Sequence, residues 1–148
     1  MLLQRLVAFG CLGILVEVVF TGMHSVLVKR DIRAPSRTYL WMFPIYGLGG
    51  AVLEYANEAN AGLHILWRSL ISTALIFAIE FACGWLLQAL LGKCPWKYLD
   101  PTNENMVHKM SVMGLIRLDY APYWYILAFL FDYNSSTIQA VLNGASRL

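Results

Sequence analysis

Four long stretches of apolar residues, separated by shorter polar segments, run through the sequence. They cover residues 6–27, 39–55, 65–91 and 120–142. The first and third exceed the roughly 20 apolar residues that a helix needs to cross the hydrocarbon core of a bilayer. The pattern therefore predicts an all-α fold: a polytopic integral membrane helix bundle of about four transmembrane helices, forming a single transmembrane domain over residues 1–148.

The second and fourth stretches carry interruptions. Pro44, Gly47 and Gly50 fall within the second, so we expect a helix broken by proline and glycine, which neighbouring helices can stabilise in a membrane. The apolar core of the fourth ends at Phe131, and this stretch spans a membrane only if its helix continues to Leu142. The alternative is an amphipathic helix that lies in the membrane interface.

Composition also indicates a membrane protein. The chain has 148 residues, of which 59% are hydrophobic and only 14% are charged, whereas a soluble domain has about 25% charged residues. This length leaves no room for an ATPase or a separate catalytic domain. The net charge of +2 is too small to favour nucleic acid as a partner. The basic residues lie near the predicted membrane edges, where they suit lipid headgroups.

Lysine and arginine indicate the orientation of the chain in the membrane. Eight of the eleven lie in the first and third loops, and cytoplasmic loops are enriched in these residues. We therefore expect both loops in the cytoplasm and both termini outside. Arg5 followed by an apolar run could also begin a signal peptide. The run contains Glu17 and lacks a small-x-small cleavage site, so we expect a retained helix.

Two glutamates lie deep inside apolar runs. Glu17 lies in the run 6–27 and Glu80 in the run 70–91, each about eleven or twelve residues from the start. At 1.5 Å per residue this depth is roughly 17 Å, about half the thickness of the hydrocarbon core. A carboxylate at that depth is costly and faces the protein interior, a cavity or a partner. The two glutamates are therefore the strongest candidates for a functional site.

Each glutamate belongs to a stripe of small and polar residues at helical spacing. Small residues let membrane helices approach closely, so the polar members of a stripe face a partner helix rather than lipid. The stripes are Gly10, Gly13, Glu17, Thr21 and His24 in the first stretch, and Thr73, Phe77, Glu80, Gly84 and Gln88 in the third.

The two carboxylates allow two interpretations. If they face each other, one holds a proton or a cation lies between them, as in a proton relay or a cation-coupled site. Alternatively, each is protonated or hydrogen-bonded to a neighbouring helix and only fixes packing, which is the commoner role of polar groups between membrane helices. The candidate substrate- or ion-binding residues are Glu17, Glu80, Thr21, His24, Thr73 and Tyr46.

Several other residues are candidates for a structural or gating role. Glu54 and Arg68 could pair across a short loop, but we favour two interfacial charges in water, where ion pairs contribute little. Arg117 and Asp119 mark either a solvated boundary or a gate at the start of the fourth stretch. The structural or gating candidates are Pro44, Gly47, Gly50, Glu54, Arg68, Gly84, Trp96, Tyr98 and Asp119.

The sequence contains no pattern for a cofactor, a metal ion or nucleophilic catalysis. The histidines His24, His64 and His108 are scattered, without the spacing of a metal site. No glycine-rich phosphate loop follows a strand, and no serine has a recognisable base partner. We therefore expect no cofactor and no metal, and favour a protein that is not an enzyme.

Five short motifs occur together in an order that resembles a known family. They are Val16–Thr21, Met42–Gly47, Glu80–Gly84, Cys94–Tyr98 and Met113–Ile116. The set is similar to the putative type IV ABC-transporter permease family, which includes transmembrane protein 229 and bacterial relatives, over about residues 10–125. Both glutamates and the Pro-Ile-Tyr-Gly sequence match the family pattern. Its usual Trp-Asp-Tyr motif reads Trp-Lys-Tyr here. The resemblance implies a multihelical membrane protein.

These observations favour one function over two others. The first is a small transport or permease component, oligomeric, in which midplane carboxylates bind a proton, a cation or a polar substrate. The second is a non-catalytic structural or accessory subunit of a larger membrane complex. A lipid-modifying enzyme ranks last, because no nucleophile or metal set accompanies the carboxylates. The expected partners are membrane lipids and either further copies of the chain or other membrane subunits.

Overall fold

Local capping groups set both ends of helix α3 (Ile65–Leu91). His64 precedes the helix, and its ring Nδ1 accepts a hydrogen bond from the Leu66 backbone N–H at 3.3 Å. Gly92 follows the helix with φ 76°, in the left-handed conformation that glycine adopts without strain. Helix α3 thus begins and ends where the apolar stretch 65–91 predicts.

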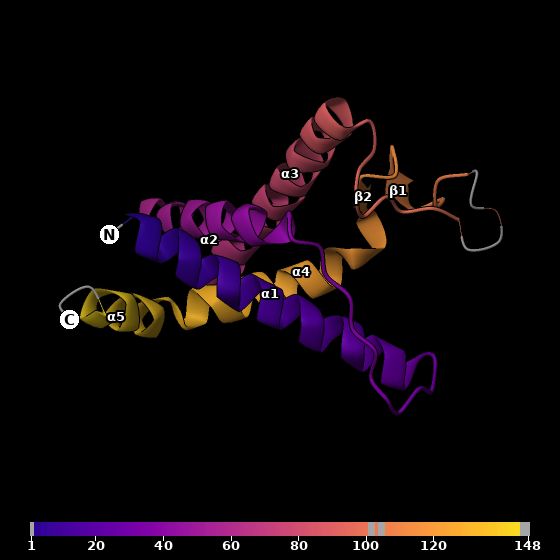
Figure 1. Cartoon of the computed structure of the whole chain (residues 1–148). Helices are drawn as coiled ribbons and strands as arrows, with labels where there is room; N and C mark the ends of the chain where they lie inside the picture. The colour runs from indigo at the N-terminus through magenta and orange to yellow at the C-terminus, as the bar shows by residue number, and fades with distance from the viewer. Residues whose placement is uncertain (1, 101–102, 104–105, 146–148) are drawn as a thin grey trace. The chain divides into compact units, whose positions relative to one another are not determined.

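A computed structural model describes residues 2–100, 103 and 106–145 (Figure 1). Over this part of the chain the fold is almost entirely helical, which agrees with the predicted all-α class. The only strands in it form one antiparallel hairpin. The elements in chain order are α1 (Leu2–Leu27), α2 (Met42–Ala59), α3 (Ile65–Leu91), β1 (Ser111–Val112), β2 (Ile116–Arg117), the 3₁₀ helix η1 (Leu118–Tyr120), α4 (Ala121–Tyr133) and α5 (Ser135–Ala145).

Two of the described helices are long and apolar enough to cross a membrane, fewer than the four predicted. They are α1, with 26 residues and a mean hydropathy of 2.2, and α3, with 27 residues and 2.0. The predicted stretch 120–142 forms two shorter helices, α4 and α5, of 13 and 11 residues. Asn134 separates them, and its side-chain amide donates to the Leu130 carbonyl at 2.7 Å.

The prediction that proline and glycine break the second helix is wrong, because α2 is continuous. Pro44 lies in its first turn, where a backbone N–H has no partner within the helix and a proline therefore costs little. Gly47 contacts α1 instead of interrupting α2: a Cβ at this position would lie 2.5 Å from the Leu6 carbonyl oxygen. The glycine thus serves close helix packing.

The chain forms two compact units, and the boundaries between them fall within α2 and α5. Unit 1 comprises Met1–Val52 and Val141–Leu148. In this unit α1 packs on the first half of α2, and segment 28–41 returns along α1 (Figure 1). The Ser25 hydroxyl fixes the segment by donating to the Pro35 carbonyl at 2.8 Å. The loop of unit 1 is therefore fastened to the helix that precedes it.

Unit 2 comprises Leu53–Ala140, and α3 and α4 form its largest helix contact. The chain turns after α3 and runs back beside it to the β1–β2 hairpin (Figure 1). Met113 and Gly114 occupy the hairpin turn with φ 54° and 73°, as a type I′ turn requires. Leu115 follows with 1% exposure and packs against Gly84 of α3. The segment after α3 thus covers that helix.

Candidate functional site

The Glu17 carboxylate lies on α1 and receives hydrogen bonds from two hydroxyl groups of unit 1. The Thr38 hydroxyl donates to Oε2 at 2.6 Å, and Tyr46 of α2 supplies the second hydrogen bond. The predicted residues Glu17 and Tyr46 are therefore neighbours, and Thr38 is a partner that the sequence interpretation missed. A carboxylate with hydroxyl donors can keep its hydrogen bonds when a proton or a cation binds, because a hydroxyl both donates and accepts.

Two further candidates on α1 have different surroundings. The Thr21 hydroxyl donates to the Glu17 carbonyl at 2.8 Å and accepts a hydrogen bond from the Arg37 backbone N–H at 3.3 Å. It joins the helix to the returning segment rather than contacting the carboxylate. His24 lies in the last turn of α1 and is exposed. The polar stripe therefore faces protein at Glu17 and Thr21 and solvent or lipid at His24.

The Glu80 carboxylate lies on α3 and is reached by a residue from outside the helices. The Tyr98 hydroxyl donates to Glu80 Oε1 at 2.8 Å. Glu80 is about three turns before the end of α3, so the segment after α3 folds back over that distance. One turn further along, a Cβ on Gly84 would lie 3.3 Å from the Trp96 ring. Four candidates, Glu80, Gly84, Trp96 and Tyr98, thus gather at one place.

The positively charged side chain of Arg117 lies beside Tyr98. The Arg117 guanidinium carbon is 5.9 Å from the Tyr98 ring centroid and 4.3 Å from that of Tyr120, within the range of a cation–π interaction. Arg117 also forms an ion pair with Asp119. The hydrogen bond from Arg117 holds the pKa of the Asp119 carboxyl below its usual value. Both members of the pair are therefore ionised at neutral pH, and the Arg117 guanidinium lies beside Tyr98, the partner of Glu80.

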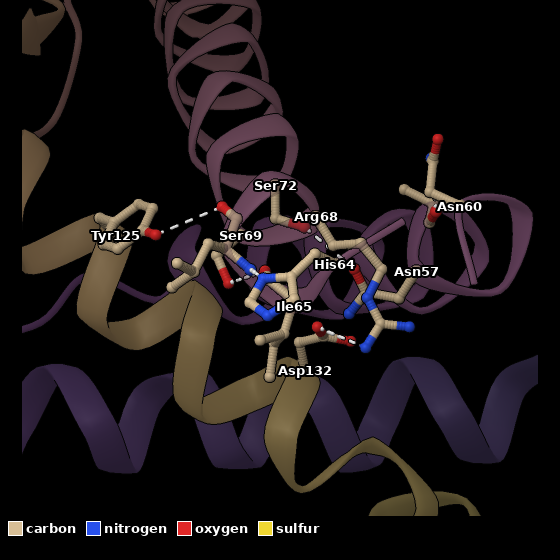
Figure 2. A network of polar contacts seen from close by, with 11 residues as sticks. Asn57, Asn60, His64, Ile65, Arg68, Ser69, Ser72, Tyr125 and Asp132 are labelled. Carbon is tan, nitrogen blue, oxygen red and sulfur yellow. Dashed lines mark hydrogen bonds and ion pairs between the residues drawn. The ribbon is translucent and has the colours of Figure 1, made fainter. Parts of the chain in front are cut away.

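A buried ion pair joins α3 to α4. Arg68 Nη2 lies 2.9 Å from Asp132 Oδ2, and the side chains are 21% and 1% exposed (Figure 2). The interpretation of Arg68 and Glu54 as interfacial charges in water is wrong, since the Arg68 charge is buried with Asp132 and Glu54 is itself 6% exposed. Packing of α4 on α3 brings Asp132 to Arg68, which local sequence does not predict.

Small polar groups surround this ion pair. The Ser72 hydroxyl donates to Asn57 Oδ1 at 3.1 Å, which ties α3 to α2 one turn from Arg68 (Figure 2). Thr73, a predicted binding residue, donates to the carbonyl of Ser69 within its own helix at 2.7 Å. Within the described part of the chain, the buried atoms Asn57 Nδ2, Arg68 Nε and Asp132 Oδ1 make no hydrogen bond. Such groups are costly in an apolar interior.

Sequence reasoning overlooked Asn57, Ser72 and Asp132. A signal for the ion pair was nevertheless present. Arg68 lies four residues inside one predicted span and Asp132 lies inside another, and opposite charges within apolar stretches tend to pair. The hydroxyl of Ser72 carried no comparable signal, because serine in an apolar helix also bonds its own backbone.

Two of the described helices have the length and apolarity of membrane spans, and each carries a glutamate with a hydroxyl partner. The family of the protein is also clear. The chain belongs to the family described as "Putative ABC-transporter type IV", whose model matches residues 5–145. This match confirms the resemblance found in the motifs. No solved structure matches the chain.

Proposed function

We propose that the chain is a small transport component of a membrane, in which Glu17 and Glu80 bind a proton, a cation or a polar group of the substrate. One observation carries the proposal: Tyr98, which belongs to no helix, donates a hydrogen bond to the carboxylate of Glu80 inside the candidate span α3. Irregular backbone at membrane depth is tolerated where it is buried in protein or lines a cavity. The loop after α3 therefore gives the Glu80 carboxylate a polar partner from outside the helices.

The chemistry of the Glu80 site suits reversible binding. The Tyr98 hydroxyl can donate to an ionised carboxylate or accept from a protonated one. Binding of a proton to Glu80 therefore does not break the hydrogen bond between the two side chains. Arg117 lies at the ring of the same tyrosine and links it to the charged Asp119. A change of charge at Glu80 therefore acts on a connected group of side chains rather than on an isolated residue.

Glu17 has the same kind of surroundings in unit 1, with Thr38 and Tyr46 in place of Tyr98. Two candidate spans thus each carry a glutamate with a hydroxyl partner. The proposal does not depend on contact between Glu17 and Glu80, which the sequence leaves open. The proposal requires only that both carboxylates are loaded during transport, and that further copies of the chain or other membrane subunits complete the pathway.

The proposal includes a topology of four crossings, to which α2 and the α4–α5 pair contribute in addition to α1 and α3. Loops 28–41 and 92–119 then lie on the cytoplasmic side of the membrane and both termini outside, as the lysine and arginine distribution favours. Cysteine variants at Lys29, Lys93 and Asn143 in a cysteine-free background test it. A membrane-impermeant maleimide should label only Asn143→Cys in intact cells and the other two in inverted vesicles. Labelling of Lys29→Cys in intact cells would contradict the topology.

Reconstituted protein tests the function itself. Proteoliposomes with a trapped pH-sensitive dye report proton flux under an imposed potential, and sodium or potassium gradients test the two cations. We expect flux above that of protein-free liposomes, and a loss of about tenfold or more in Glu17→Gln and in Glu80→Gln, because one polar contact of about 1.4 kcal/mol corresponds to a factor of ten. Glu58→Gln, which removes an exposed carboxylate paired with Gln139, is the matched control.

The outcomes separate the proposal from its competitors. Wild-type flux in the double variant Glu17→Gln/Glu80→Gln would overturn the role of the carboxylates. The absence of any flux from folded wild-type protein, for protons and for both cations, would favour a polar substrate or an accessory role. Circular dichroism of each variant distinguishes lost flux from lost folding.

A further inference from the structure

An apolar groove runs along the last turns of α1 in unit 1, outside the carboxylate sites. Its volume is about 400 Å³, within the range of small-ligand sites in proteins. Val19, Met23 and Leu27 of α1 line one side and are at least half exposed, whereas Ala34 lines the other side. Exposed apolar side chains in a concave surface favour an apolar ligand.

The fold holds this groove open. Gly22 forms part of its wall, and a Cβ there would lie 2.8 Å from the Ser36 hydroxyl, so glycine permits segment 28–41 to approach. Hydrogen bonds from Ser25 to the Pro35 carbonyl and from the Arg37 N–H to Thr21 fasten the segment on both sides. These contacts hold the segment that forms one wall of the groove against α1.

The segment that borders the groove is basic. Segment 28–41 contains four basic residues and one acidic residue, which gives a net charge of +3. The Asp31 carboxylate already pairs with Arg33, whose Nε and Nη2 groups each donate a hydrogen bond to it at 2.9 Å. Lys29, Arg30 and Arg37 are exposed, and all three lie within three residues of a residue that lines the groove.

We propose that this groove binds an acyl chain of an anionic phospholipid, whose headgroup lies against Lys29, Arg30 and Arg37. The groove supplies the apolar contact, and the three cations supply the charge that a phosphate-bearing headgroup requires. Its position at the end of a candidate span matches the level of lipid headgroups. The inference is independent of the proposed transport function, because it uses neither Glu17 nor Glu80.

Lipid retention by the full-length protein tests the proposal. The purified protein is exchanged into detergent with phosphatidylglycerol or phosphatidylcholine of identical acyl chains, and bound lipid is counted by native mass spectrometry. We expect phosphatidylglycerol to bind about tenfold more tightly, because each basic residue near a headgroup adds to the attraction. The triple variant Lys29→Gln/Arg30→Gln/Arg37→Gln should lose this preference.

Two pairs of variants separate the headgroup from the acyl chain. Lys93→Gln/Lys97→Gln/Lys109→Gln removes the same charge from exposed residues of another loop and should leave binding unchanged. Met23→Trp fills the groove at an exposed position and should lower the binding of both lipids. Leu12→Trp places the same side chain on an exposed part of α1 outside the groove and should not.

Several results would overturn the proposal. Equal retention of the two lipids by the wild-type protein excludes an anionic site. Equal loss in the two glutamine triple variants shows a general charge effect, and unchanged binding in Met23→Trp shows that the groove holds no chain. Inorganic phosphate at millimolar concentration should not displace the lipid, and displacement would indicate a phosphate site alone. If the first triple variant does not fold, Met23→Trp and the single variant Lys29→Gln decide the question.

Discussion

The helices α1 and α3 have nearly the same mean hydropathy, 2.2 and 2.0, yet they contact their neighbours by different means. In unit 1, α1 and α2 approach through glycines whose missing side chains leave room for the other helix. In unit 2, α3 contacts α2 and α4 through a hydrogen bond and a buried ion pair. Equal apolarity therefore does not imply equal packing: one contact depends on shape and the other on polar partners.

The difference matters for function as well as for stability. A contact that depends on shape is indifferent to charge, whereas a buried ion pair responds to any change in the charge of its members. Unit 2 depends on a contact of the charge-sensitive kind, because it contains the Arg68–Asp132 pair and buried polar atoms that lack hydrogen bonds. Glu80, with its tyrosine partner, lies on the same helix. We therefore expect unit 2 to be the more sensitive to substitutions that remove polar groups.

Loss of one member of the Arg68–Asp132 pair should have the largest effect on stability. Arg68→Ala or Asp132→Ala leaves a buried charge without its partner, which typically costs about 3–5 kcal/mol. The free energy of unfolding in micelles, followed by tryptophan fluorescence during denaturant titration, measures this cost. The double variant Arg68→Met/Asp132→Leu should recover most of the loss.

The matched control for this prediction is Arg33→Ala. That arginine also pairs with an aspartate, but its side chain is 85% exposed, so water screens the pair and the loss should be much smaller. If Arg68→Ala costs no more than Arg33→Ala, the ion pair does not hold unit 2 together.

Glycine substitutions on α2 should give the next largest effect. Gly47→Ala places a Cβ 2.5 Å from the Leu6 carbonyl oxygen, and overpacking of this kind costs about 1–3 kcal/mol. Gly49→Ala, two residues away, meets no atom within 4 Å and should be neutral or stabilise the helix by up to about 1 kcal/mol. Thermal unfolding of the two variants compares them directly. Equal stability would show that close packing of α1 and α2 is not needed.

The surface pair Arg117–Asp119 should give the smallest effect, visible through its pH dependence. The pKa of Asp119 is lower in the folded protein because Arg117 hydrogen-bonds the charged form. The pair therefore stabilises the fold above the usual aspartate pKa of about 4, and its contribution disappears as the pH falls through the lower folded value. Wild-type protein should unfold at a higher temperature than Asp119→Asn at pH 7, and the difference should shrink as the pH falls below the usual aspartate pKa of about 4. A constant difference would contradict the assignment.

Much of the helical framework could be predicted from local patterns. The bounds of α3 follow from the length of its apolar run and from His64 and Gly92 at its ends. The continuous α2 was not predicted, because the cost of a proline depends on its place in the helix and Pro44 lies in the harmless first turn. The division of residues 120–142 at Asn134 depends on one side chain that bonds the preceding turn.

The candidate site was only partly predictable, because the glutamates can be found in the sequence but their partners cannot. Glu17 and Glu80 stand out because a carboxylate in an apolar run is rare, and each does have a specific polar partner. The partners come from elsewhere: Tyr98 from a loop that folds back, and Asp132 of the ion pair from α4. Contacts between residues distant in sequence depend on tertiary packing, which periodicity within one segment does not encode.

We propose that Glu17 and Glu80 change their protonation or ligation when a proton or a cation binds. Infrared difference spectroscopy of the reconstituted protein measures this directly in the carbonyl region of protonated carboxyl groups, on a change of pH or on exchange of sodium for potassium. We predict difference bands that are weaker in Glu17→Gln and in Glu80→Gln, lose both contributions in the double variant, and keep both contributions in Glu58→Gln. Identical difference spectra of the wild-type protein and the double variant would contradict the account.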